Sequence, residues 1–545
     1  MRNGNTYQKL SSGFHKANID MKKILLSLII ISFGFSFFII SCEKKHTKRS
    51  EPKAAKVNSG PSFDSTLVRP FFKKYPELQE YQKEVTQLYL KRNYQYIWYD
   101  KKGILEVGHL LYNKINHLEE EGVKTTIPYK KKLDAIFQNS EAISEPNATD
   151  ELFMSSYYFL YVNKVLKGLD TKKTIELGWF LPRKKLSYVN YLDSIIANPS
   201  LIEKNEKEVF SQYYSLKEVL QKYKKIAKDN TWNPIETDSS FIAFKPGDSS
   251  QTIAQIRHRL FILGDLSNDS KRATYDDSLI TGILKYKKRM GSLKNNHITK
   301  KTIASLNIPI VDRIKTIMVN MERCRWITAD IASSKELIVV NIPAYELTYF
   351  KEGETVLTSN VVVGKDLNKT IIFSANMRYI VFSPYWNVPS SIIKKEIKPG
   401  IAENKNYLEE HNMERKNGII RQKPGPKNSL GLVKFLFPNP YSIYLHDTPS
   451  KELFNREKRA FSHGCIRVAK PKELAMEILK DDPIWTSAKI DSAMNKKEEI
   501  WQTLKNKIPV FIGYFTAWVD ADGVIHFYDD VYQRDEQLAT LLFDE

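Results

Sequence analysis

The densest cluster of reactive side chains in this chain is Ser462-His463-Gly464-Cys465-Ile466-Arg467, and His446 precedes it with 15 residues between them. A cysteine is a nucleophile only as its thiolate, so Cys465 needs a base within hydrogen-bond reach. The imidazole of His446 can take that proton and later return it to an amine. The glycine before Cys465 permits a tight turn that aims backbone N–H groups at a developing oxyanion, and Arg467 can clamp a substrate carboxylate. A buried cysteine is commonly inert, but this many polar neighbours favour a catalytic thiol.

Length and composition restrict the class of protein. The chain has 545 residues with 83 Lys and Arg against 63 Asp and Glu, a formal charge of +20. At roughly 100–200 residues per domain, this length predicts two to four domains. A hydrophobic content of 42% excludes a mostly disordered chain, and three cysteines exclude a disulfide scaffold. The positive excess points to a polyanionic partner: nucleic acid, anionic lipid or an acidic polymer.

The N-terminus indicates the compartment. Residues 24–40 are uncharged, as in a signal peptide or a short membrane anchor. The Ile39-Ile40-Ser41-Cys42 stretch that closes this segment resembles the lipobox of bacterial lipoproteins, in which the cysteine is diacylated and becomes the mature N-terminus. We therefore expect a lipoprotein signal peptide at 1–42, a flexible tether at 43–62 and a periplasmic protein held at the bacterial membrane by lipidated Cys42. The alternative is an uncleaved anchor. Either location excludes nucleic acid as a partner.

Two helical units are expected after the tether. Residues 63–238 show helix-like spacing of Leu, Tyr and Val, which predicts a helical scaffold domain. Residues 240–310 have short helical patterns and resemble the small three-helix peptidoglycan-binding domain. The usual Phe-Gln of that domain is replaced by Tyr286-Lys287, so both a wall-binding unit and a structural spacer remain open.

The remainder predicts a β-rich domain over 335–545, which makes the fold class multidomain α+β. Its β-branched and aromatic runs indicate strands, with a return to helix over 471–505 and a final hairpin around Asp522-Gly523. The Gly-, Pro- and Lys-rich stretch at about 384–440 is expected to be a long insertion, and loops of that length are usually lids or binding loops.

The cluster around Cys465 carries a family resemblance. A histidine followed, after a spacer of this length, by Ser/Thr-His-Gly-Cys resembles the signature of the L,D-transpeptidase catalytic domain of the YkuD type. Tyr385-Trp386-Asn387-Val388-Pro389 and the segment 421–431 are similar to its large periplasmic subfamily, which has scaffold and peptidoglycan-binding domains. In that subfamily the insertion caps the substrate.

The resemblance implies a role for each residue of the motif. Cys465 is the nucleophile, and His446 is the base, oriented by the backbone carbonyl after it, although a role for the Asp447 carboxylate stays open. His463 and Gly464 line the oxyanion region. The residues implied in substrate binding are Arg467, Ser462, Tyr444, Asn428 and Trp386, of which the last three serve equally well as packing residues.

The implied reaction joins peptidoglycan stem peptides as donor and acceptor. The Cys465 thiolate attacks the carbonyl of the third residue of a tetrapeptide, D-Ala leaves, and an amine of a second stem resolves the thioester into a 3→3 crosslink. No cofactor and no metal is expected. Carbapenem-type β-lactams are implied as acylating inhibitors of Cys465.

Two alternatives remain open from sequence. Water in place of the acceptor amine would make the enzyme an L,D-carboxypeptidase or hydrolase, and a wall-binding anchor without turnover is the alternative of a different class. The long insertion favours transfer because it can exclude water. Cys324, the third cysteine, is expected to be a free, packed thiol, since a disulfide to Cys465 would silence the enzyme.

Overall fold

The computed structural model describes residues 61–545 except 101, 139–145, 184–185, 204–208, 230–231, 293–294, 329–330, 332–333 and 544–545. The expected signal peptide, most of the tether and Cys42 lie outside the described residues. The fold begins slightly earlier than the predicted boundary at 63, because the Pro61 carbonyl accepts a hydrogen bond from the Tyr96 N–H at 3.1 Å. Within the described ranges, no helix is long and apolar enough to cross a membrane.

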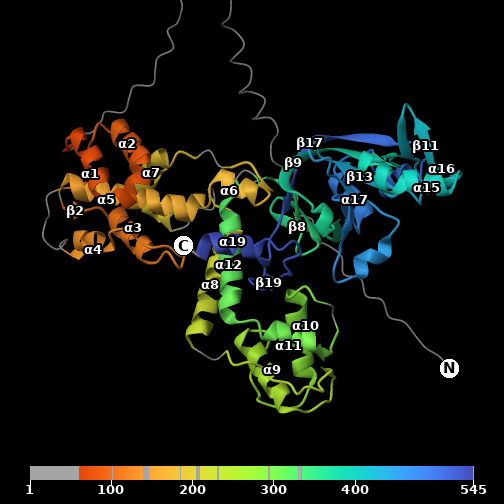
Figure 1. The fold of residues 1–545 in the computed structure, drawn as a ribbon, viewed down its shortest axis with the longest axis horizontal. Helices are drawn as coiled ribbons and strands as arrows, with labels where there is room; N and C mark the ends of the chain where they lie inside the picture. The colour runs from red at the N-terminus through yellow and green to blue at the C-terminus, as the bar shows by residue number, and fades with distance from the viewer. Residues whose placement is uncertain are drawn as a thin grey trace, which may run out of the picture. The chain divides into compact units, whose positions relative to one another are not determined.

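The N-terminal part is helical, as the spacing of its apolar residues predicts (Figure 1). Its helices are α1 (Val68–Lys74), α2 (Gln82–Lys91), α3 (Glu106–Asn116), α4 (Lys130–Gln138), α5 (Ala148–Tyr161), α6 (Thr171–Glu176), α7 (Tyr188–Ala197) and α8 (Gln212–Lys228). Helix α5 is its centre, since its residues from Glu151 to Tyr161 are all buried. The Asn147 side chain caps this helix by accepting from the Asp150 N–H at 2.9 Å. A short strand, β3 (Trp179–Phe180), leaves the helical part and joins the main sheet beside β9 (Ile372–Phe382).

Residues 240–310 fold around their own hydrophobic cluster. Three helices, α9 (Gln251–Ile262), α10 (Asp277–Arg289) and α11 (Lys300–Leu306), accompany a two-stranded pair, β4 (Ala243–Phe244) and β5 (Ile298–Thr299). The three-helix pattern expected here is present. Tyr286 and Lys287 are both buried: the Tyr286 hydroxyl bonds Ser305 Oγ at 2.7 Å, and Lys287 Nζ donates to Asn295 Oδ1 at 2.7 Å. This dipeptide therefore supports the fold of the unit.

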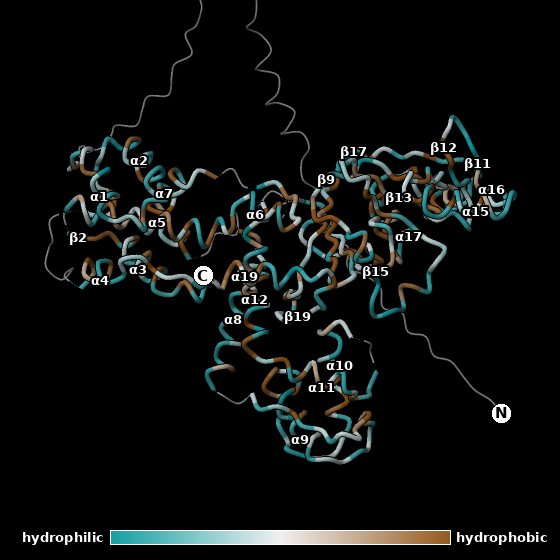
Figure 2. Tube along the Cα trace, viewed as in Figure 1, coloured by the Kyte–Doolittle hydropathy of each residue, from teal (hydrophilic) through white to brown (hydrophobic). Residues whose placement is uncertain are grey.

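The β-rich part is a closed sheet. Its strands are β6 (Glu336–Asn341), β7 (Glu346–Lys351), β8 (Glu354–Gly364), β9 (Ile372–Phe382), β13 (Val433–Leu436), β14 (Leu445–His446), β16 (Ile466–Val468) and β17 (Ile500–Gly513). They follow the order β13-β14-β16-β8-β7-β6-β17-β9, and pairing of β13 with β9 closes the barrel. Figure 2 shows hydrophobic residues gathered along β9, where Ile380, Val381 and Phe382 are fully buried.

The insertion forms a separate small layer. Strands β10 (Trp386–Asn387), β12 (Ile419–Gln422) and β11 (Met413–Lys416) make a three-stranded sheet. Short helices α14 (Ser390–Ile392), α15 (Lys398–Glu403) and α16 (Tyr407–Glu410) and a π-helical turn at Ile393–Ile397 accompany it, around a cluster that includes Val388 and Met413. The predicted limit at 440 is too long, because the buried side chains of Val433 and Phe435 return β13 to the barrel.

The C-terminal part departs from the prediction at one point. Helices α17 (Pro471–Ile478) and α18 (Ser487–Met494) agree with the expected return to helix. The prediction of helix for residues 500–505 is wrong, because these residues begin strand β17. That strand pairs with β9 from Ile500 onward, so sheet pairing overrides local helical preference. Strands β18 (Ala517–Val519) and β19 (Ile525–Phe527) form the expected hairpin. The chain ends in α19 (Asp535–Phe543).

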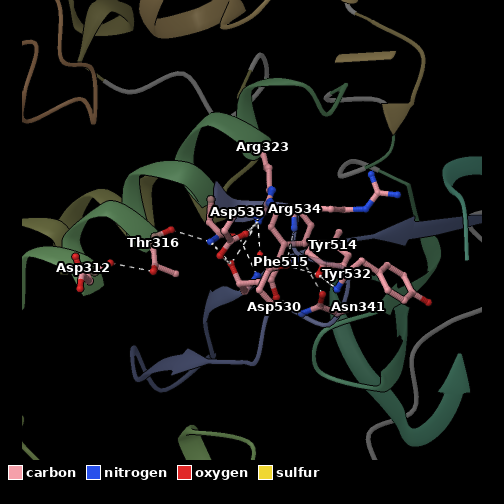
Figure 3. Close-up of polar contacts among 12 residues, drawn as sticks. Asp312, Thr316, Arg323, Asn341, Tyr514, Phe515, Asp530, Tyr532, Arg534 and Asp535 are labelled. Atoms are coloured by element: carbon pink, nitrogen blue, oxygen red, sulfur yellow. Dashed lines mark hydrogen bonds and ion pairs between the residues drawn. The ribbon is translucent and has the colours of Figure 1, made fainter. Parts of the chain in front are cut away.

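Helix α12 (Ile310–Arg325) joins the helical part to the barrel. It packs against α8 and α19, and Arg323 forms an ion pair with Asp535 at 2.6 Å (Figure 3). Asn320 of the same helix accepts from the Thr516 N–H at 3.0 Å. One continuous hydrophobic core extends from Phe63 to Leu538 through both parts. The expected multidomain α+β class, with a helical N-terminal part and a β-rich C-terminal part, is confirmed.

Candidate active site

Parallel pairing of β14 with β16 brings the two halves of the motif together. Leu445 lies opposite Ile466, and His446 lies opposite Arg467. Cys465 directly precedes β16, so it lies beside Tyr444, two positions before His446 on the neighbouring strand. Tyr444, the residue before β14, hydrogen-bonds Cys465, and its ring centroid is 5.7 Å from that of His446.

The His446 ring is fixed in one tautomer. Its Nδ1 lies 2.5 Å from the Asp447 carbonyl oxygen, and a carbonyl can only accept, so Nδ1 carries the proton and Nε2 is left with its lone pair. Burial, together with the positive charges of Arg467 and Lys434, lowers the pKa of His446 to about 3 against the opposing effect of this hydrogen bond. The imidazole is therefore neutral, with an unprotonated Nε2.

Cys465 is a free cysteine, and its side chain is partly exposed. Its Sγ donates to the Ser442 carbonyl oxygen at 3.6 Å. Burial raises the pKa of Cys465, while hydrogen bonds from the backbone and hydroxyl of Tyr444 and the charge of Arg467 act in the opposite direction. Both the Cys465 thiol and the His446 imidazole are therefore neutral in this environment.

The turn before the nucleophile is held by buried hydroxyls. Gly464 has φ of 119°, a conformation that favours glycine. Ser462 Oγ donates to the Cys465 carbonyl at 2.5 Å and accepts from the Gly464 N–H at 3.1 Å. Thr370 Oγ1 donates to the Gly464 carbonyl at 3.0 Å. The Gly464 N–H is therefore already used, and this glycine shapes the turn without supplying an oxyanion donor of its own.

Two predicted substrate-binding residues border the thiol. Arg467 is half-buried, its pKa is lowered by burial, and the charges of Glu452 and Cys465 oppose that effect. Its Nε is buried and has no hydrogen-bond partner among the described residues. Burial raises the pKa of Tyr444, which is hydrogen-bonded to Cys465 and to Trp386 of the insertion. Trp386 thus reaches the site through Tyr444.

His463 points away from the barrel core. It is exposed, and its Nε2 lies 3.2 Å from Glu396 Oε1 on the π-helical turn of the insertion. Glu396 is not among the residues predicted from the sequence, because it is far from His463 in the chain. This contact ties the insertion to the residue two positions before the nucleophile.

Asn428, which was predicted to bind substrate, forms hydrogen bonds within the protein instead. Asn428 is fully buried: its Nδ2 donates to the carbonyls of Pro384 at 3.0 Å and Lys423 at 2.9 Å, and its Oδ1 accepts from the Leu430 N–H at 2.8 Å. It therefore organises the base of the insertion and does not line a substrate wall.

The Asp447 carboxylate accepts from the Leu432 N–H at 2.8 Å and from Lys451 Nζ, so it is turned away from His446.

Cys324, the other cysteine among the described residues, lies in the hydrophobic core. Cys324 is a free thiol with no exposed surface, and burial raises its pKa, as expected of a packed residue. In the part of the chain that the structure describes, no group of three or more His, Cys, Asp or Glu side chains is placed to hold a metal ion.

Comparisons with known proteins agree with this arrangement. Residues 335–485 match the L,D-transpeptidase catalytic domain, and residues 83–220 match the Scaffold domain. A putative L,D-transpeptidase of Haemophilus influenzae is 31% identical over 269 residues, which cover 45% of this chain and 54% of that protein, so the chain spans about half the length of this relative.

Two solved structures have weaker likeness. An L,D-transpeptidase of Xylanimonas cellulosilytica is 12% identical with a TM-score of 0.18, over 51% of this chain and all of that one. One from Mycobacterium smegmatis is 13% identical with a TM-score of 0.19, over 33% and 58% of the two chains. Such distant likenesses carry no argument. The two domain matches and the relative identify residues 335–485 with the YkuD-type L,D-transpeptidase catalytic domain, preceded by residues that match the Scaffold domain.

Proposed function

We propose that this protein is a peptidoglycan L,D-transpeptidase that forms 3→3 crosslinks through a Cys465 acyl-enzyme. The observation that carries the proposal is the neutral His446, with Nδ1 held by the Asp447 carbonyl, on the strand beside the one that Cys465 precedes. This arrangement supports a thiol–imidazole pair in which the base is oriented by a backbone group.

The first step forms the thioester. His446 Nε2 takes the Sγ proton as Sγ attacks the carbonyl of the third residue, usually diaminopimelate, of a donor tetrapeptide. The tetrahedral intermediate collapses by breaking the bond to D-Ala, and the imidazolium returns its proton to the departing amine. The Arg467 guanidinium is suited to bind a stem carboxylate near the attacked carbonyl.

The second step forms the crosslink. An amine of an acceptor diaminopimelate attacks the thioester carbonyl and gives its proton to His446. The Cys465 sulfur then leaves and recovers a proton from the imidazolium. The energy of the cleaved peptide bond is kept in the thioester, so the step needs no nucleotide.

The insertion favours transfer over hydrolysis. It contacts the site through the Trp386–Tyr444 hydrogen bond and the Glu396–His463 contact, and a cover of this kind excludes water and orders an acceptor. The alternative remains an L,D-carboxypeptidase that uses the same acyl-enzyme, and a non-catalytic wall-binding anchor is the remaining candidate.

Mass spectrometry of muropeptides incubated with the protein distinguishes these outcomes. Dimers with 3→3 links support transfer, tripeptides alone support hydrolysis, and unchanged tetrapeptides support an anchor. Cys465→Ala is expected to abolish both products. The same variant tests the proposed inhibitors, since a carbapenem-type β-lactam should add its mass to the parent protein and not to Cys465→Ala.

We also propose that the protein is a lipoprotein of the bacterial cell envelope, lipidated at Cys42. The apolar segment 24–40 and the Ile39-Ile40-Ser41-Cys42 stretch support this location. Metabolic labelling with a fatty acid should mark the parent protein, whereas Cys42→Ala should remain unlabelled and unprocessed.

A further inference from the structure

A large groove lies outside the site described above. Its floor is the outward face of strands β6, β7 and β8, where Val339, Thr348 and Phe350 point into a cavity of about 1030 Å³. The β18–β19 hairpin, the residues 454–459, the start of α8 and the end of α10 also line it. None of Cys465, His446 and Tyr444 lines it.

The groove is joined to the nucleophile by a short length of chain. The loop 454–459 belongs to the segment between His446 and Ser462. The Arg459 carbonyl accepts from the Val363 N–H at 2.9 Å, and Ala460 then pairs with Val363 in register. A ligand in the groove would therefore lie along the same loop that ends at the catalytic turn.

The charged side chains that line the groove carry both signs, with Lys288, Arg456 and Arg459 against Glu346, Glu457, Asp520 and Asp522. His526 Nε2 lies 2.8 Å from Asp520 Oδ2, and Arg459 Nη2 donates to the Tyr345 carbonyl at 3.1 Å. Burial raises the pKa of Glu346, which shifts this carboxyl toward its neutral form. A lining in which positive and negative side chains nearly balance favours a neutral polar ligand over a phosphate or an acidic peptide.

Aromatic rings complete the lining. Phe350, Trp518 and Tyr528 are each half-buried in the groove, amid threonine and serine hydroxyls. Rings with an apolar face beside hydroxyl groups match the faces and edges of pyranose sugars. The volume lies at the upper end of the ~300–1,000 Å³ usual for small-ligand pockets, which suits a segment of polymer.

We propose that this groove binds the glycan strand of peptidoglycan through its N-acetylhexosamine units, while the stem peptide reaches Cys465. The proposal rests on the proposed function, because that function supplies the polymer. It adds a sugar-binding site to an enzyme whose chemistry concerns only peptides.

The test is calorimetric binding of a peptide-free N-acetylglucosamine tetramer to the full-length protein. The parent should bind, and Phe350→Ala should weaken binding at least tenfold. Thr348→Trp, which fills the groove from an outward-facing position, should do the same. Phe261→Ala is the matched control, since Phe261 is 42% exposed on α9 and does not line the groove. The proposal would be overturned if the parent did not bind the tetramer. It would also be overturned if both groove variants kept the melting temperature of the parent and bound the tetramer as tightly as the parent does.

A second measurement separates this proposal from the proposed function. Cys465→Ser should keep tetramer binding and lose crosslinking. For Phe350→Ala, the ratio of crosslinking on intact glycan strands to crosslinking on free tetrapeptides should fall about tenfold. An unchanged ratio contradicts the groove alone, whereas failure of the parent to crosslink any substrate contradicts the proposed function and leaves tetramer binding to decide the groove.

Discussion

Thr370 Oγ1 donates a hydrogen bond to the Gly464 carbonyl at 3.0 Å and accepts one from the Gly364 N–H at 2.9 Å. The buried Tyr532 hydroxyl completes the arrangement by donating to the Gly364 carbonyl at 2.6 Å and accepting from the Thr370 N–H at 3.2 Å. Two side chains distant in sequence thus fix the backbone immediately before the nucleophile.

Thr370→Val should slow acylation of Cys465. The substitution keeps the shape but leaves the Gly464 carbonyl and the Gly364 N–H without their partner, at about 1–3 kcal/mol for each buried group. We expect at least a tenfold lower rate of acylation by a carbapenem, measured by intact-protein mass. Thr370→Ser, which keeps the hydroxyl, should recover most of the rate. Equal rates for Thr370→Val and the parent would show that this hydroxyl does not position the turn.

The pH dependence should lack the usual histidine limb. His446 is a base only when neutral, and burial lowers its pKa from the ordinary value of about 6.5 to about 3. Acidification from about pH 7 to about pH 5 therefore leaves it neutral, and kcat/KM should not fall by half near pH 6.5. Lys434→Met removes one positive charge that lowers this pKa, so its acid limb should move to higher pH. A parent profile with its midpoint near pH 6.5 would contradict the assignment.

Asn428→Ala should act on stability and not on substrate affinity. It removes partners from the buried Pro384 and Leu430 backbone groups, which costs about 1–3 kcal/mol for each. Thermal unfolding should shift downward, and the KM for a tetrapeptide should change little in the protein that remains folded. Asn387→Ala, at an exposed position of β10, is the control and should leave the melting temperature unchanged. A raised KM at constant melting temperature would restore Asn428 to the substrate wall.

Breaking the Arg323–Asp535 ion pair should destabilise the packing of α12 against α19. Arg323 has no exposed surface, and removal of one partner of a buried pair costs about 3–5 kcal/mol. Calorimetry of Arg323→Met should show a lower melting temperature. Lys472→Met breaks the exposed pair with Asp491 and should cost no more than about 1 kcal/mol. Similar melting temperatures for the two variants would refute the importance of the buried pair.

The sequence predicts the catalytic motif, whose residues are close together in the chain, better than the contacts from distant residues that hold the motif in place. The spacing of His446 and Cys465 indicates the motif because both belong to one short segment whose strands pair. Thr370 and Gly464 are 94 positions apart, so only the closed barrel brings them together. Helix α12 lies between the predicted domain limits 310 and 335, although the apolar spacing of Ile310, Ile314 and Ile317 could have indicated it. Residues 500–505 became strand because β9 pairs with them, a contact that no local pattern encodes.

The most direct test of a Cys465 acyl-enzyme that transfers to an amine is intact-protein mass spectrometry with a tetrapeptide donor. We expect an adduct on Cys465 equal to the stem peptide without its D-Ala, discharged as a 3→3 dimer when a diaminopimelate-containing acceptor is added. Release of D-Ala with no adduct on Cys465, or the same adduct in Cys465→Ala, would contradict it.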